Sequence, residues 1–109
     1  MRKVDKPWGY EIIWAETESY IGKILHINKG SRLSKQYHEI KEETVYVIKG
    51  VLYNCDENDK IKKVLQGESF HVLPNQIHRF CAIDCDVEIV EVSTPHLDDV
   101  VRIEDDYNR

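Results

Sequence analysis

Apolar and polar residues alternate in short runs along most of the chain. A period of two residues is typical of β-strands that have one buried face. The runs are rich in β-branched and aromatic residues, which favour strands. They predict strands over residues 9–15, 20–28, 44–50, 51–55, 60–65, 68–73, 78–83 and 87–93. No segment has the period of a helix of useful length, so the chain is predicted to be all-β.

Turn-forming residues separate these runs at the spacing expected for a β-sandwich or β-barrel. Examples are the segments at residues 28–30 and 66–67. A chain of 109 residues has the usual size of one domain, so residues 1–109 are predicted to form a single domain. Only residues 95–109 lack clear strand character. We expect them to form either a helical turn around residues 97–101 or an arm lying on the barrel.

The charge of the chain limits its partners. It carries 15 basic and 20 acidic residues, a net charge of -5, with no clustered basic stripe, which argues against a nucleic-acid partner. No apolar run approaches the roughly 20 residues of a membrane span. The first three residues are followed by polar positions rather than by the apolar region of a signal peptide. We therefore expect a cytoplasmic protein with no nucleic-acid or membrane partner.

Cysteine usage does not indicate a disulfide framework or a thiol-ligated metal. The three cysteines, Cys55, Cys81 and Cys85, cannot all pair within one chain, and none belongs to a CxxC motif. Free thiols are the expected state.

Ligand-type side chains occupy strand positions near the middle of the chain. Gln36 and His38 are two residues apart, so on a strand they point to the same face, and Glu43 follows a short turn. His78 begins a later strand and could join them if the sheet curls into a barrel. A cation inside the barrel would explain these residues, because coordination removes the cost of burying polar groups. A surface or hydrogen-bonded histidine is the alternative for His38.

The spacing of these residues resembles the first sequence motif of the cupin superfamily. Between Gly30 and Gly50, the residues Gln36, His38 and Glu43 stand at the intervals of that motif, with Gln in the place of its first His.

The second cupin motif follows. It begins at Gly67 and places His78 at its His position, with Asn75 where a glycine is usual. Asn is the best substitute for Gly where a turn needs a positive φ. The resemblance implies a cupin double-stranded β-helix, a jelly-roll barrel.

Longer segments narrow the resemblance to the isolated C-terminal cupin of type II phosphomannose isomerases. They are KPWGYE at 6–11, GKILHINKGSRLSKQYHEIKEE at 22–43, IHRF at 77–80 and DDVVRIEDDYNR at 98–109. In that family the domain commonly follows a mannose-1-phosphate guanylyltransferase domain. The resemblance implies one divalent metal ion, Zn²⁺ first, with Mn, Co, Fe or Ni as alternatives. The implied ligands are Gln36, His38, Glu43 and His78.

The activity implied by the resemblance is the interconversion of mannose 6-phosphate and fructose 6-phosphate through an enediol(ate). The metal would stabilise the negative oxygen that develops. Phosphate requires cations, and the positions that match the family are Lys23, Arg79, Arg102 and Arg109. A solvated surface charge is the alternative for each of them.

The sequence does not single out a proton carrier. The candidates are Glu11, His26, His71 and Asp106. The chain also departs from the family pattern at Lys41, where an arginine is usual, and a lysine lacks the planar two-pronged donor.

Two alternative functions are also considered, and a homodimer is predicted. One rival is a non-catalytic cupin that binds a metal and a phosphorylated or nucleotide-linked sugar. The other, an iron-dependent dioxygenase, is disfavoured because such cupins usually present three His ligands and Gln36 is a neutral oxygen donor.

A homodimer is expected because the strand at residues 10–14 would leave an edge or apolar patch exposed. Trp8 and Trp14 are interpreted as packing residues, with a sugar platform as the alternative.

Overall fold

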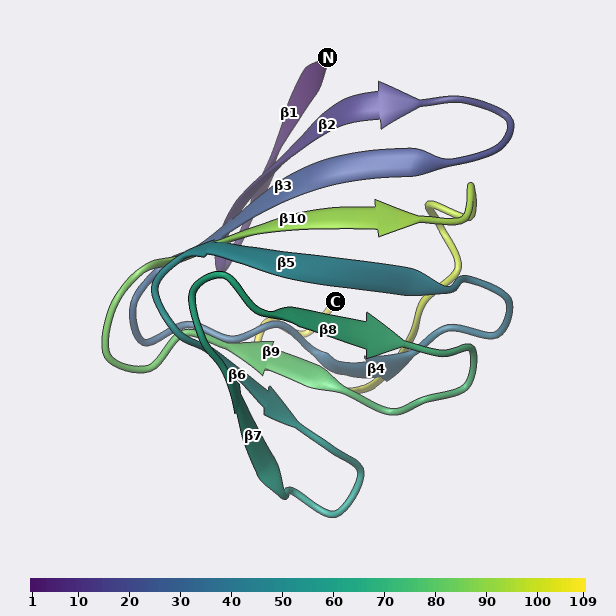
Figure 1. Cartoon of the computed structure of the whole chain (residues 1–109). Helices are drawn as coiled ribbons and strands as arrows, with labels where there is room; N and C mark the ends of the chain where they lie inside the picture. The colour runs from purple at the N-terminus through teal and green to yellow at the C-terminus, as the bar shows by residue number, and fades with distance from the viewer.

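Eleven β-strands and no helix make up residues 1–109 in this computed structural model (Figure 1). The strands are β1 (Arg2–Lys6), β2 (Gly9–Glu16), β3 (Ile21–Ile27), β4 (Lys35–Tyr37), β5 (Glu43–Lys49), β6 (Leu52–Cys55), β7 (Ile61–Val64), β8 (Ser69–Val72), β9 (Arg79–Cys81), β10 (Val87–Ser93) and β11 (Val101–Glu104). Every run predicted as a strand contains one, so the all-β prediction is confirmed. Three strands lie outside the eight runs, namely β1, β4 and β11; a strand at β4 was expected only from the ligand-type residues Gln36 and His38.

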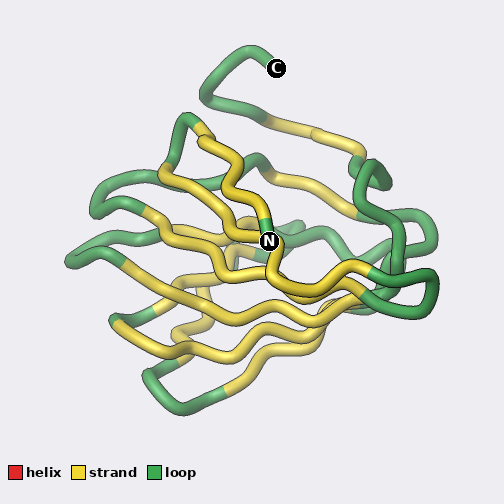
Figure 2. Tube along the Cα trace, turned by 90° about the horizontal axis from the view of Figure 1, so that it is seen from above, coloured by secondary structure: helices red, strands yellow, loops and turns green.

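The strands form two layers. A six-stranded sheet has the order β1-β2-β3-β10-β5-β8, and smaller sheets have the orders β7-β6-β9 and β11-β4. Two isolated bridges, Gln36 with His78 and Arg32 with Cys81, join the β4 segment to β9 and its flanks, so the small sheets make one second layer (Figures 1 and 2). The structure contains no helix with the length and apolar character of a membrane span.

The inward face of the large sheet changes from apolar to charged along its strands. On β3, Ile27 and Leu25 belong to the core, and the next inward position is the buried Lys23. The inward positions of β5 and β10 change in the same way, from valine and isoleucine to Glu43 on β5 and to Glu91 on β10, both buried. The core cluster comprises Trp8, Leu25, Ile27, Leu33, Val45, Val47, Leu52, Val64, Val72, Phe80, Ala82, Val87 and Ile89. The barrel is therefore apolar at one end and lined with charge at the other.

The N-terminal edge differs from the expectation. β1 pairs with β2, so the strand at residues 10–14 is hydrogen-bonded on both sides and exposes no edge. The edge strand is β1, whose charged side chains discourage pairing with another chain. Trp14 lies on the outer face over Gly22, where an added Cβ would be only 2.5 Å from the indole. The edge argument for a dimer is therefore wrong, although 43% of Trp14 remains exposed.

The C-terminal segment forms an arm rather than a helical turn. β11 pairs with β4, which places Val101 opposite Tyr37 and Arg102 opposite Gln36. Beyond β11, the Asp105 carboxylate accepts hydrogen bonds from the backbone and guanidinium of Arg109, which holds the end of the chain. The arm alternative of the sequence analysis is confirmed, and the helical turn does not form.

Candidate metal centre and its cavity

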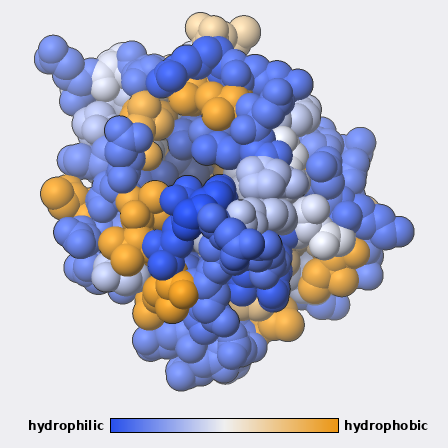
Figure 3. All heavy atoms as spheres, turned by 180° about the vertical axis from the view of Figure 1, so that it is seen from behind, coloured by the Kyte–Doolittle hydropathy of each residue, from blue (hydrophilic) through white to orange (hydrophobic).

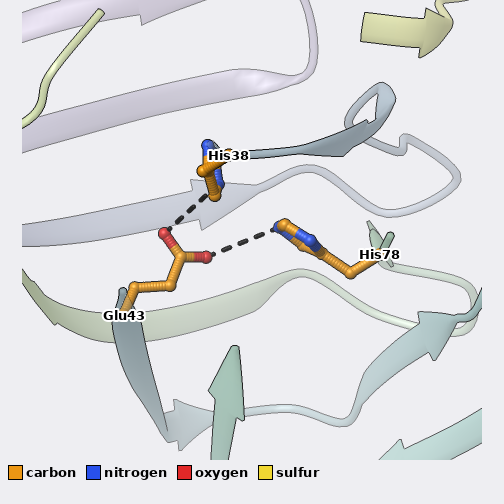
Figure 4. A group of neighbouring side chains, drawn as sticks. All are labelled: His38, Glu43 and His78. Carbon is orange, nitrogen blue, oxygen red and sulfur yellow. Dashed lines mark ion pairs between the residues drawn. The ribbon is translucent and has the colours of Figure 1, made fainter. Parts of the chain in front are cut away.

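Two histidines and a glutamate converge inside the barrel (Figure 4). His38 directly follows β4, Glu43 opens β5, and His78 directly precedes β9. The distances from Nε2 of His38 and Nε2 of His78 to the nearer oxygen of the Glu43 carboxylate are both 3.6 Å. One ligand atom from each residue lies within 4.8 Å of the others, and all three side chains are buried.

Backbone carbonyls orient both imidazoles for ligation. Nδ1 of His78 donates to the carbonyl of Gln76 at 3.0 Å, and Nδ1 of His38 donates to the carbonyl of Asp99. Since a carbonyl only accepts, Nδ1 carries the proton in each ring and Nε2 keeps its lone pair. Both Nε2 atoms are buried and have no hydrogen-bond partner, which is unusual for polar atoms unless another group completes the site.

The chemistry of the triad fits a divalent metal. Burial, followed by the nearby Lys41 ammonium, lowers the pKa of His38, and burial lowers the pKa of His78. Both rings are therefore neutral at physiological pH, as ligands must be. A donor set of two imidazoles and one carboxylate suits zinc, manganese, cobalt or iron. The unpartnered Nε2 atoms and this donor set together fit the divalent metal ion that the resemblance implied.

Gln36, the fourth predicted ligand, lies beside the triad. It forms a hydrogen-bonded backbone pair with His78, and residues directly opposite in such a pair share a face. Its side-chain Oε1 accepts a hydrogen bond from the Ser34 hydroxyl at 2.7 Å. Gln36 lines the same cavity as His38 and Glu43, from which an amide oxygen could complete the ligand set.

Lys41 is a component of the site that the sequence analysis did not assign. Its side chain is buried, and its Nζ lies 2.8 Å from the Glu43 carboxylate and 3.1 Å from that of Glu91. Burial opposes the charge on Lys41, but Glu91 and Glu43 outweigh it and raise the pKa of the ammonium. Burial and the charge on Glu43 raise the pKa of Glu91. Glu91 could have been found by extending the inward alternation of residues 87 and 89.

Buried charge continues along the inner face of the large sheet. Lys23 is directly opposite Glu91 on the neighbouring strand. Its Nζ lies 3.3 Å from the Glu11 carboxylate, which Lys6 approaches to 3.8 Å. Lys23 is therefore not a solvated surface charge, because only 7% of the residue is exposed.

These residues line a cavity of about 260 Å³. Its wall carries six basic side chains, Arg2, Lys6, Lys23, Lys41, Arg102 and Arg109. It carries four acidic ones, Glu11, Glu43, Glu91 and Asp98. Figure 3 shows a hollow near the middle of the face seen from behind, with hydrophilic residues around much of its rim. The cavity has an excess of positive side chains in a chain whose net charge is -5, so it favours an anionic ligand.

The structure separates the four predicted phosphate-binding residues. Lys23, Arg102 and Arg109 line the cavity. Arg102 has no carboxylate within ion-pair distance, whereas Arg109 is paired with Asp105. Arg79 does not line the cavity. Its guanidinium donates to the carbonyl of Leu33 at 2.9 Å and to Asp106 at 3.1 Å, on the opposite side of β9 from the neighbouring His78.

Of the four candidate proton carriers, only Glu11 lines the cavity. His26 stacks on Tyr10 with ring centroids 4.9 Å apart. The exposed His71 lies 2.8 Å from the Glu42 carboxylate. Asp106 is held between two arginines, Arg32 and Arg79.

The tryptophans have different environments. Trp8 is 3% exposed and belongs to the core, although it also borders the cavity. Trp14 lies outside the cavity, so it is not a platform for a sugar there.

A two-layered antiparallel barrel with His and Glu ligands gathered inside it defines the class of the protein as a cupin, and solved structures support this. It aligns with a cupin-like protein from Thermotoga maritima with a TM-score of 0.78 and 14% identity, covering 91% of this chain and 78% of that one. More specifically, residues 1–105 match the family of mannose-6-phosphate isomerase C-terminal domains, and the chain belongs to that family. No curated protein sequence matches it.

Other solved structures that share the fold belong to different proteins. KdgF from a Halomonas species aligns with a TM-score of 0.77 and 19% identity, covering 87% of this chain and 88% of that one. A cupin-superfamily sugar phosphate isomerase from Silicibacter pomeroyi aligns with a TM-score of 0.69 and 16% identity, covering 78% of this chain and 58% of that one. At such identities the likeness extends to the fold alone, and the function must be argued from the site.

Proposed function

We propose that the protein is a metal-dependent sugar-phosphate isomerase that interconverts mannose 6-phosphate and fructose 6-phosphate. The observation that carries this proposal is one cavity that is lined by His38 and Glu43 of the triad and by a wall rich in basic side chains. A sugar phosphate has matching ends, because its hydroxyl and carbonyl oxygens suit a metal centre and its phosphate suits the cations. Membership of the mannose-6-phosphate isomerase C-terminal family supports the same class of substrate.

The residues of the chain have separate roles in this proposal. When bound, a divalent metal supplies a Lewis acid for adjacent sugar oxygens. Arg102 binds the phosphate, because it stands opposite Gln36 on the neighbouring strand and has no carboxylate partner of its own. Arg109 supports it from the end of the arm.

Glu11 moves the proton between C2 and C1 of the open-chain sugar. It is the one candidate carboxylate that borders the cavity, and Lys23 and Lys6 fix its position through ion pairs. A general base must lie within hydrogen-bond reach of the proton that it abstracts. Glu11 lines the cavity in which the sugar would bind, so its carboxylate is available for this role.

The deciding experiment is an isomerase assay on the purified protein. Mannose 6-phosphate would be incubated with protein loaded separately with Zn²⁺, Mn²⁺, Co²⁺ or Fe²⁺, and fructose 6-phosphate would be measured. Turnover by the wild type that is lost in both His78→Ala and Glu11→Gln supports the proposal. Binding of mannose 6-phosphate by calorimetry without turnover would instead support the non-catalytic, sugar-phosphate-binding cupin. Neither binding nor turnover would refute both.

A further inference from the structure

The buried Lys41 forms an ion pair with Glu43, the carboxylate of the candidate metal site. Nζ of Lys41 is 2.8 Å from Glu43 and 3.1 Å from Glu91, and the exposed fraction of Lys41 is only 6%. We propose that Lys41 is a built-in counter-cation that competes with the metal for Glu43. It would stabilise the metal-free barrel and weaken metal binding, so that it sets the affinity of the site.

The position of Lys41 does not depend on a metal ion. The Asp99 carboxylate accepts hydrogen bonds from the backbone amides of Glu39, Ile40 and Lys41, at 3.0, 2.7 and 2.8 Å. The loop that carries Lys41 is therefore fixed by a group on the C-terminal segment. From this fixed loop, the Lys41 ammonium reaches both buried carboxylates.

Charge balance explains why the lysine is needed. Glu43 and Glu91 are both buried, and Lys41 is the cation that contacts both of them. An unpaired buried carboxylate strongly destabilises a fold, so Lys41 stabilises the protein when no metal is present. A divalent ion on Glu43 would place a second positive centre close to the ammonium, and the two would repel each other in a region of low effective dielectric.

The experiment compares three variants at one pH, using Zn²⁺ and Mn²⁺ as probes. Dissociation constants come from competition with a chromophoric chelator, and the melting temperature is measured on metal-free protein. Lys41→Met keeps the length of the side chain but removes its charge. We expect it to bind metal at least tenfold more tightly, which corresponds to about 1.4 kcal/mol, and to melt at a lower temperature without metal.

Lys23→Met is the matched control. It also removes a buried lysine that is paired with a cavity glutamate, but Lys23 contacts Glu11 and no metal ligand. We expect a lower melting temperature and an unchanged metal affinity.

Glu91→Gln should change the metal affinity in the direction opposite to Lys41→Met. It leaves Lys41 with Glu43 as its one charged partner, so the lysine should compete more strongly and metal binding should weaken.

Each outcome decides the question. If Lys41→Met unfolds without metal but folds when Zn²⁺ is added, as followed by circular dichroism, the stabilising role is supported. Glu91→Gln, which keeps the lysine, then tests the competition. The inference is overturned if Lys41→Met binds metal no more tightly than the wild type, if Lys23→Met tightens binding equally, or if the wild type binds no metal. Because no step uses sugar turnover, an inactive wild type would refute the isomerase and leave this test intact.

Discussion

Asp99 should be the residue outside the ligand set whose loss most weakens the metal centre. Its carboxylate accepts three backbone hydrogen bonds from the loop between His38 and Glu43, and its carbonyl accepts Nδ1–H of His38. Hydrogen bonds from the backbone amides, with the largest effect from Lys41, lower the pKa of the Asp99 carboxyl to about 2. Asp99→Ala removes the carboxylate but leaves the carbonyl, so the loop should loosen while the fold persists.

The magnitude follows from the three lost bonds. Hydrogen bonds to a charged partner contribute about 1.5–3 kcal/mol each, and because Asp99 is partly exposed we count about 1 kcal/mol for each, or about 3 kcal/mol in all. For a domain of this size that corresponds to a fall in melting temperature of roughly 12 °C. Groups that orient metal ligands typically change metal affinity by about 10- to 100-fold, so we also expect at least tenfold weaker binding.

The assay is thermal unfolding by circular dichroism together with a chelator competition for Zn²⁺. Asp98→Ala is the control, because Asp98 is the exposed neighbour and its carboxylate accepts no hydrogen bond. Its melting temperature should stay within about 2 °C of the wild type, as surface substitutions usually change stability by less than about 0.5 kcal/mol. Equal effects of Asp99→Ala and Asp98→Ala would refute the reasoning.

Four further predictions concern the metal, the substrate, the arm and the assembly. His78→Ala should abolish the metal content measured by elemental analysis and the metal-induced rise in melting temperature, since a ligand of the native state stabilises it. Arg102→Ala should raise the KM for mannose 6-phosphate with metal content unchanged, and Arg102→Lys should recover only part of it. A hydrogen bond from Arg109 lowers the pKa of Asp105 to about 2, below its unfolded value, so the arm should be fully stabilised above about pH 4 and lose this contribution as pH falls through about 2. Carboxyl NMR of Asp105 would show the shift, and Arg109→Ala should reverse most of it. A homodimer remains our prediction, now from the half-exposed Tyr46 and Val92 on the outer sheet face, and light scattering at micromolar concentration should give twice the chain mass of 12.8 kDa.

The sequence by itself determined the class of fold and pointed to the candidate metal ligands, three of which the structure brings together. Strand alternation follows from local geometry, since successive side chains point to opposite faces, so eight runs could be assigned without knowing their partners. The positive φ of Asn75, 66°, was equally predictable, because it belongs to one turn. The same local rule could have excluded Arg79 from the cavity, since it follows His78 directly and must face the other way.

Only the tertiary structure decided which charged residues share the cavity. β1 and β11 are held largely by backbone pairing to β2 and β4, so their own side chains carry little strand signal. Lys41 contacts Glu43 on the next strand, β5, and also Glu91 on β10, which lies 50 residues further along the chain. Such contacts depend on sheet order and register, which bring distant segments together through interactions that neither segment encodes alone. The candidate ligand positions could be predicted because each motif is a short local stretch of sequence. The charged residues around them could not, because their contacts depend on how the barrel closes.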